Sequence, residues 1–144
     1  MSADRIFSIC NMIAIMGWIV LVFFPMWKSR DRYVTGTIAI LFSIIYTSIM
    51  ARSFEPGIFE SFGTLTGVAD LFQNKFLLVA GWVHYLAFDL FVGSWIVRNA
   101  RQHNINHWLT VPALLLTFML GPVGYLVYFI MRWIKTKTFI AQDI

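Results

Sequence analysis

Four long apolar stretches dominate this sequence, and they restrict the chain to a membrane-spanning architecture. They cover about residues 6–27, 33–51, 76–97 and 108–132. A helix that crosses the hydrocarbon core of a bilayer needs about 20 predominantly apolar residues. Only 12% of the residues are charged, whereas a soluble domain carries about 25%. We therefore predict an all-α integral membrane bundle of four transmembrane helices, in one domain over residues 1–144, with both termini on the same side.

The connection between the second and third apolar stretches, residues 53–75, is long and acidic. It contains Glu55, Glu60 and Asp70, and the sequence Glu55-Pro56-Gly57 favours a turn. Apolar residues then recur at helical spacing, which predicts one short amphipathic helix in this connection. The residues that carry this spacing are Leu65, Val68, Leu71 and Phe72. The sequence leaves two interpretations of the connection open, a solvated loop or a lid over the bundle.

The third apolar stretch carries two ionisable side chains, His84 and Asp89, near its middle. Ionisable groups are costly inside a bilayer and normally face the bundle interior or a polar cavity, so we expect both to point into the bundle. A carboxyl group away from water favours its neutral form, so Asp89 could donate a proton, and a neutral histidine could accept one. The alternative is that both side chains are polar contacts between helices, without a role in chemistry.

Helical periodicity sorts the third stretch into two stripes. His84 and Asp89 are five positions apart and are therefore separated by about 140° around a helix. They can border one cavity or meet two different neighbouring helices. The stripe of Asp89 also contains Trp82, Tyr85, Gly93 and Ile96, and the stripe of His84 contains Phe88, Phe91 and Trp95.

The fourth stretch contains a helix-breaking sequence, Gly121-Pro122-Val123-Gly124, near its middle. Proline inside a helix removes a hydrogen-bond donor and clashes with the preceding turn. We predict a kink or a break at this point, with Gly124 packed against another helix. The carbonyl groups that a break frees must be satisfied by protein or by a polar cavity.

The net charge of +4 comes from basic clusters beside the apolar stretches. We interpret them as anchors in the lipid headgroup region, and without a nucleic-acid-binding motif we expect no nucleic-acid partner. His103 and His107 are spaced like one edge of a metal site, but the chain has only three histidines and one cysteine, so we expect no metal. With four crossings, the lysines and arginines divide almost evenly between the two sides and do not define an orientation.

Two segments of the sequence are long and distinctive. Residues 81–96 read GWVHYLAFDLFVGSWI, and residues 111–126 read VPALLLTFMLGPVGYL. Both resemble the signature of the abscisic-acid-deficient-four-like, or neoxanthin-synthase-like, integral membrane proteins. The resemblance extends from about Phe62 to Trp133 and loosely to both ends.

The resemblance implies a multi-pass membrane protein and a carotenoid-related isomerase activity. Plant members of the family are implicated in making neoxanthin from violaxanthin, an isomerisation that opens an epoxide and forms an allene. Such a reaction requires an acid and a base but no redox cofactor, so we expect none. Asp89 as acid and His84 as base is one assignment, and the reverse is equally open. Asp70 and Glu60 could contribute from the loop, and the predicted substrate-binding residues are Trp82, Tyr85, Tyr125 and Asn11.

A non-catalytic function fits the same sequence. The helices could bind an apolar lipid or pigment, or hold a partner enzyme, with the polar residues only orienting the ligand. The expected partners are the lipid bilayer and a carotenoid or other apolar ligand, and the sequence is compatible with a homo-oligomer. A small transporter is less favoured because the chain has no internal repeat. The first apolar stretch begins within a few residues of Met1, so we expect a bacterial-type member in a plasma membrane.

Overall fold

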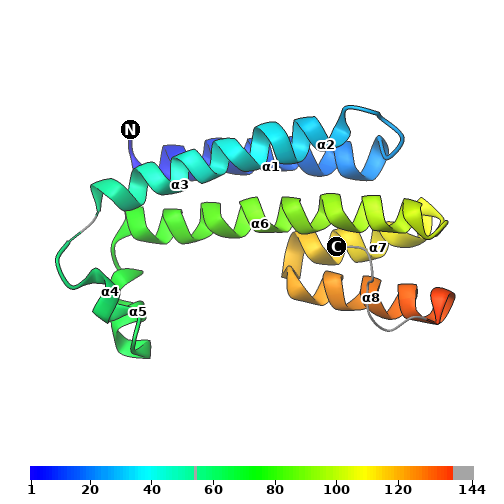
Figure 1. Ribbon diagram of the computed structural model, residues 1–144. Helices are drawn as coiled ribbons and strands as arrows, with labels where there is room; N and C mark the ends of the chain where they lie inside the picture. Colours follow the sequence, from blue (N-terminus) through cyan, green and yellow to red (C-terminus); the bar gives the residue numbers. More distant parts are fainter. Residues whose placement is uncertain (54, 138–144) are drawn as a thin grey trace.

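The computed structural model describes residues 1–53 and 55–137, and these residues form helices joined by short connections (Figure 1). The predicted all-α class is confirmed. The second apolar stretch is a continuous helical segment in which a π-helical turn, η1, separates two α-helical parts. In chain order the elements are α1 (Ala3–Phe23), α2 (Arg30–Tyr33), η1 (Val34–Ala39), α3 (Ile40–Arg52), α4 (Ile58–Ser61), α5 (Leu65–Leu71), α6 (Lys75–Gln102), α7 (His107–Leu120) and α8 (Pro122–Thr136).

Three helical segments are long and apolar enough to cross a membrane: Ala3–Phe23, Arg30–Arg52 and Lys75–Gln102. They correspond to the first three apolar stretches of the sequence. The longest of them, α6, lies at the centre of the molecule and contacts α1, η1, α3, α7 and α8 (Figure 1). The three predicted crossings are therefore supported by the length and composition of the observed helices.

The fourth apolar stretch does not confirm the prediction of a fourth spanning helix, because its described residues form two shorter helices in place of one long helix. It forms α7 and α8, which pack against each other as an antiparallel hairpin beside the second half of α6 (Figure 1). With 14 residues, α7 is about 21 Å long, shorter than the roughly 30 Å hydrocarbon core. The described end of α8 consequently lies at the opposite end of the bundle from Met1, and not at the same end as predicted.

The reversal between α7 and α8 is made by Gly121. Its φ of 49° lies in the region that favours glycine, and Pro122 follows as the first residue of α8, where its missing N–H is not needed. The predicted break at Gly121-Pro122 is confirmed. Gly124 packs against α7, which is the first half of the same apolar stretch and not another of the predicted helices; a side chain at Gly124 would overlap with backbone atoms of Ala113 and Thr117.

The hairpin changes the distribution of charge along the bundle. Of the 11 lysines and arginines, only Arg5, Arg52 and Lys75 lie at the end that holds Met1 and α4. The other eight lie at the opposite end, which we call the basic end and which contains the α1–α2 loop, the α6–α7 loop and the end of α8 (Figure 1). These eight residues are Lys28, Arg30, Arg32, Arg98, Arg101, Arg132, Lys135 and Lys137.

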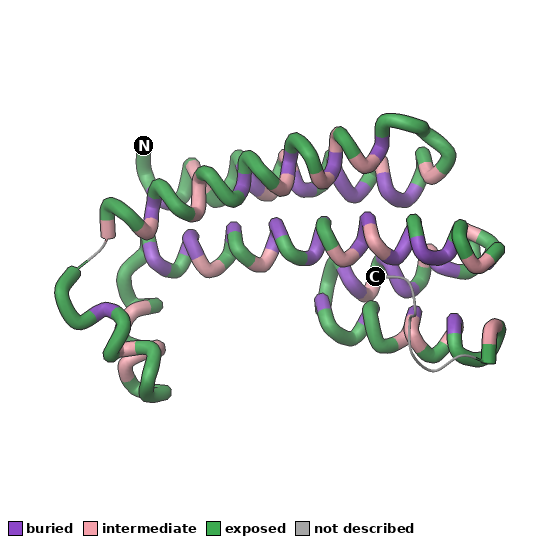
Figure 2. Tube along the Cα trace, viewed as in Figure 1, coloured by how far each residue is buried: buried purple, intermediate pink, exposed green. Residues whose placement is uncertain are grey.

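Burial is concentrated on α6 and on the helix faces that meet it (Figure 2). Leu90 and Val97 are fully buried there, and Gly17 of α1 lets Leu90 approach the backbone closely. The outer faces carry many exposed large apolar side chains, such as Met12 and Leu109. This surface suits contact with lipid.

The connection after α3 contains two short helices, α4 and α5, which pack on each other near the start of α6 (Figure 1). The predicted short helix in this connection is confirmed by α5, whose N-terminus is capped by the Thr64 side chain. None of the residues of α5 is buried. The side chain of Phe72, which follows α5, lies beside Gly81 of α6.

Candidate functional site

Asp89 lies inside the bundle, at the tip of the α7–α8 hairpin. Its side chain is 8% exposed, and its Oδ2 atom has no hydrogen-bond partner among the described residues. A methyl group at Gly121 would lie 3.1 Å from Asp89 Oδ1, so the helix break approaches the carboxyl group directly. The predicted inward orientation of Asp89 is confirmed, and one of its oxygens is free to interact with a ligand.

Tyr85 lies one turn before Asp89 on α6 and connects α6 to the hairpin. Its hydroxyl group donates a hydrogen bond of 3.3 Å to the carbonyl oxygen of Phe118 and also interacts with the Asp89 carboxyl group. The Phe118 carbonyl belongs to the last turn of α7, where carbonyl groups lack partners within the helix. Tyr85 therefore supplies the hydrogen-bond donor that a carbonyl group freed by a helix break inside a membrane requires.

Trp18 of α1 completes the surroundings of the hairpin tip. Its ring lies against Gly93, where a methyl group would come within 2.8 Å of it, and is centred 5.5 Å from the ring of Phe118. The Trp18 Nε1 atom is buried without a hydrogen-bond partner among the described residues. Gly93 is one turn beyond Asp89, about 6 Å along the helix. An unpartnered donor and an unpartnered acceptor thus lie in the same region of a predominantly apolar bundle.

His84 does not lie with Asp89, and the predicted inward orientation is wrong for this residue. Its side chain is exposed on the outer face of α6, with its ring centred 5.6 Å from that of Tyr46 and 4.6 Å from that of Phe88. The stripe of Asp89 faces α1 and the hairpin, whereas Phe88 and Phe91 of the His84 stripe are exposed. The 140° between the two residues therefore separates a buried side chain from an exposed one that lies beside Tyr46 of α3.

The predicted substrate-binding residues divide into two groups. Trp82 Nε1 donates a 2.8 Å hydrogen bond to Asn11 Oδ1, and the Trp82 ring is centred 5.3 Å from that of Tyr85. Asn11, Trp82 and Tyr85 therefore form a continuous row along α1 and α6 that leads to Asp89. Tyr125 lies elsewhere, on α8, with its ring centred 5.6 Å from that of Trp95.

Asp70 and Glu60 are exposed in the α4–α5 region and do not join Asp89. Asp70 accepts a 3.1 Å hydrogen bond from Gln73 and borders a cavity of about 330 Å³ beside Asn74 at the start of α6. Asn74 and Asp89 are about 22 Å apart along the helix. Within residues 1–53 and 55–137, no group of three or more His, Cys, Asp or Glu side chains is arranged to hold a metal ion.

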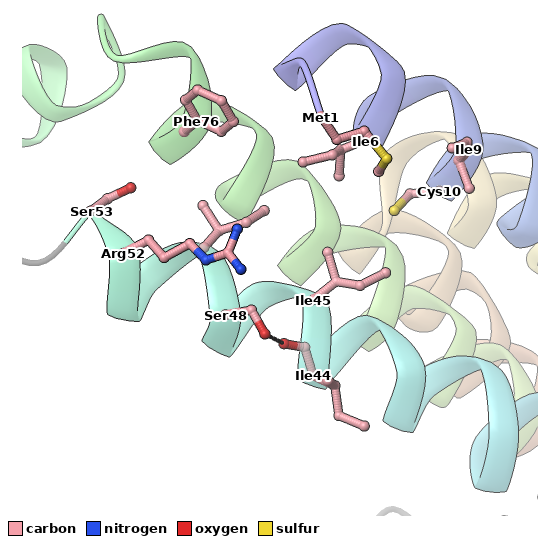
Figure 3. Close-up of a pocket in the computed structure, with 11 residues that line it drawn as sticks. Met1, Ile6, Ile9, Cys10, Ile44, Ile45, Ser48, Arg52, Ser53 and Phe76 are labelled. Atoms are coloured by element: carbon pink, nitrogen blue, oxygen red, sulfur yellow. Dashed lines mark hydrogen bonds between the residues drawn. The ribbon is translucent and has the colours of Figure 1, made fainter.

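An apolar cavity of about 460 Å³ lies between α1 and α3 at the end of the bundle that holds Met1 (Figure 3). Arg52 stands at its edge, and the Ser48 hydroxyl group is bonded to the carbonyl of Ile44 (Figure 3). Cavities of this size hold small ligands. Most of its lining residues are apolar, and five of the eleven are isoleucines: Ile6, Ile9, Ile44, Ile45 and Ile49.

A polar network at the basic end was missed by sequence reasoning. Ser94 of α6 donates a 2.9 Å hydrogen bond to Asp31 Oδ1, which also accepts bonds from two nitrogens of Arg30. Thr35, within the π-helical turn η1, donates to Ser94 Oγ at 3.2 Å. The only signal in the sequence was the presence of these small hydroxyl residues in otherwise apolar stretches. The network joins α2 and η1 to α6.

Comparison with known proteins places the chain in a family. A family model described as ABA DEFICIENT 4-like matches residues 5–128. Neither the curated proteins nor the solved structures include a significant match. The match runs from the first turn of α1 to the first half of α8, and it includes the row of polar residues that leads to Asp89 and the break at Gly121. The family and the apolar helices together indicate a membrane protein, and the chain belongs to the ABA DEFICIENT 4-like family.

Proposed function

We propose that this chain is a cofactor-free isomerase that acts on a carotenoid, a xanthophyll or another apolar lipid, with Asp89 as its proton donor. The observation that carries this proposal is the unpartnered Oδ2 atom of the buried Asp89 at the hairpin tip. An ionisable group inside a membrane bundle is costly and usually marks a functional pathway or site. Family membership supports the substrate class.

Opening of an epoxide to an allene can be carried out by one carboxyl group acting twice. The Asp89 carboxyl group donates its proton to the epoxide oxygen as one carbon–oxygen bond breaks. The adjacent vinyl carbon then loses its proton, and the electron pair of that carbon–hydrogen bond forms the new double bond. The Asp89 carboxylate takes up this proton, which restores the acid. Substrate and product have the same composition, so the reaction needs no oxidant or reductant.

Two neighbours support this reaction. The Tyr85 hydroxyl group, which donates its proton to the Phe118 carbonyl, interacts with the Asp89 carboxyl group and is suited to position it. The Trp18 N–H group, whose ring packs at the hairpin tip, is a buried donor without a partner among the described residues. Hydrogen-bond donors that are fixed before the reaction stabilise developing negative charge without reorganisation. His84 has no place in this mechanism because its side chain lies on the outer face of α6.

We further propose that the α7–α8 hairpin is re-entrant, so that the chain crosses the membrane three times. The hairpin enters from the basic end and turns back at Gly121. Cytoplasmic segments of membrane proteins carry an excess of lysine and arginine. The concentration of eight of the 11 basic residues at the basic end supports a cytoplasmic location for that end and an opposite location for α4 and α5.

A second candidate function is non-catalytic binding of an apolar lipid or pigment. It is favoured by the cavity between α1 and α3, which is lined by apolar side chains and lies beside Phe76, about 20 Å along α6 from Asp89. A ligand confined to that cavity would lie away from the carboxyl group. In this alternative Asp89 stabilises the hairpin and performs no chemistry.

The two candidates are separated by expressing the chain in a bacterium that makes a defined epoxide-containing xanthophyll. Pigments are analysed both in whole-cell extracts and in the purified protein. We expect conversion by the wild type, and Asp89→Asn to lower the rate by at least about 100-fold, as loss of a general acid does. His84→Ala is the matched control, because it removes an ionisable group from the same helix outside the site.

The outcomes distinguish the functions clearly. Conversion that is lost in Asp89→Asn while pigment still copurifies supports the isomerase. Pigment that copurifies unchanged with the wild type supports the binding protein. Full conversion by Asp89→Asn refutes the assignment of Asp89 as the acid, and loss of conversion in His84→Ala restores His84 as a candidate base.

A further inference from the structure

A cluster of buried hydrogen-bond donors near the basic end lacks an acceptor. Arg132 of α8 is 1% exposed, and none of its three guanidinium nitrogens has a hydrogen-bond partner among the described residues. Asn99 of α6 is also 1% exposed, and its Nδ2 atom is unpartnered within the same residues. These four nitrogen atoms are buried hydrogen-bond donors without a described acceptor.

Packing between α6 and α8 holds the cluster in position. Tyr128 and Arg132 are four residues apart and share one face of α8. The Tyr128 hydroxyl group donates a 2.7 Å hydrogen bond to Asn99 Oδ1, which occupies the amide oxygen and leaves the amide nitrogen unused. The Tyr128 ring meets that of Trp95 edge-on at 5.8 Å, and the Arg132 guanidinium carbon lies 5.6 Å from the centre of the Phe129 ring.

The energetics of this arrangement require an anion. A guanidinium group stays charged in proteins, and a buried charge without a partner strongly destabilises the fold. No described carboxylate forms an ion pair with Arg132. The planar arrangement of its N–H groups matches the paired oxygens of a phosphate or a carboxylate. The Asn99 amide supplies a further donor for the same ligand.

We propose that Arg132 and Asn99 form a binding site for an anionic group of the phosphate or carboxylate class. Asn99 lies in the last turn of α6 and Arg132 in the last two turns of α8, so the site is at the depth of the headgroups at the basic end. A phospholipid headgroup and a free phosphate ion share the required chemistry. The site is separate from Asp89, which lies ten residues earlier on α6, about 15 Å along the helix.

The test measures the thermal unfolding midpoint of the purified full-length protein in a neutral detergent. Three additions are compared: phosphatidylglycerol, phosphatidylcholine and inorganic phosphate. We expect a saturable rise of the midpoint with phosphatidylglycerol and little change with phosphatidylcholine. The apparent affinity should fall by about tenfold or more in Arg132→Met, since charge-assisted hydrogen bonds are the stronger ones. Lys135→Gln, which removes a neighbouring cation, should respond like the wild type.

The direction in which Arg132→Met shifts the unfolding midpoint provides a second criterion. Without an anion, the variant should be as stable as the wild type or more stable, because it removes an unpaired buried charge. With saturating phosphatidylglycerol, the wild type should unfold at a higher temperature than Arg132→Met. Asn99→Asp offers a variant that retains Arg132: its carboxylate supplies the missing acceptor, so it should be folded and insensitive to added anion.

Each result bears on the proposal. A response to phosphatidylglycerol alone identifies a lipid headgroup, and a response to inorganic phosphate as well identifies a site for small anions. An equal response in wild type and Arg132→Met, or no response in the wild type, overturns the proposal. Asp143→Asn is included because a carboxylate of the chain could act as the acceptor. If Asp143→Asn lowers the unfolding midpoint as much as Arg132→Met does in phosphatidylglycerol, the acceptor is a carboxylate of the chain itself, and the proposed site is refuted.

Discussion

Replacement of Gly124 by alanine tests whether the hairpin is closed by direct backbone packing. A methyl group at this position would come closer than 3.0 Å to the backbone nitrogen of Thr117 and the carbonyl oxygen of Ala113. Rotation of a side chain cannot relieve a clash with backbone atoms, so α7 and α8 would have to separate. Overpacking of this kind costs about 1–3 kcal/mol, and we place this case at the upper limit, about 3 kcal/mol.

Part of this cost is offset, because alanine favours a helix over glycine by about 0.5–1 kcal/mol. The net loss should be about 2 kcal/mol, which lowers the thermal midpoint by about 4–8 °C for a chain of this size. The matched control is Gly36→Ala, where the nearest atom to the new methyl group is Arg32 Cγ at 3.8 Å.

Gly36→Ala should leave the midpoint unchanged or raise it slightly. The measurement is helical circular dichroism during heating of both variants and the wild type in the same detergent. If Gly124→Ala unfolds at or above the wild-type temperature, α7 and α8 do not pack backbone against backbone at Gly124.

Three other predictions follow from described contacts. Reporter fusions after Lys28, after Gln102 and after Lys137 should all report the cytoplasm, and a fusion after Phe62 should report the opposite side. If the fusion after Lys137 reports the same side as the fusion after Phe62, the chain has a fourth crossing. Tyr85→Phe removes the hydrogen bond to the Phe118 carbonyl and should cost about 1–2 kcal/mol, measured as a lower unfolding midpoint. Ser94→Ala breaks the link between Asp31 and Thr35 and should cost about 1 kcal/mol. Ser43→Ala removes only a bond to the Ala39 carbonyl one turn earlier in the same helical segment and should change stability by less than about 0.5 kcal/mol.

The helices of the first three apolar stretches could be predicted from the sequence because each stretch is long and is bounded by charged residues. The fourth stretch has the same composition but folds differently. Apolar composition indicates that a segment avoids water, and it does not indicate the direction in which the chain continues. A single residue with positive φ, Gly121, reverses the chain without changing the polarity of either half. The break was visible in the sequence, and the reversal was not.

The candidate site shows a similar division. Periodicity correctly grouped Asp89 with Tyr85 and Gly93 on one face of α6. It could not show which neighbouring helices would cover that face, so the orientation of His84 could not be fixed. The sequence favours a headgroup anchor at Arg132, because a cation at the end of an apolar stretch is typical of one. Its burial depends on the hairpin, which brings α8 back beside Asn99.

In the proposed re-entrant topology, the hairpin also makes the two leaflets of the bilayer unequal for the ligand that is proposed to reach Asp89. Because α7 and α8 lie beside only the second half of α6 (Figure 1), the first half of α6 keeps apolar side chains such as Leu78 and Trp82 exposed. A lipid-soluble molecule can therefore approach the hairpin tip sideways, through the leaflet nearer α4 and α5, without passing through water. The leaflet at the basic end is closed to such an approach by the hairpin itself. Delivery of the ligand would then depend on which leaflet contains it, and an enzyme of this design would process one monolayer of the membrane and leave the other untouched.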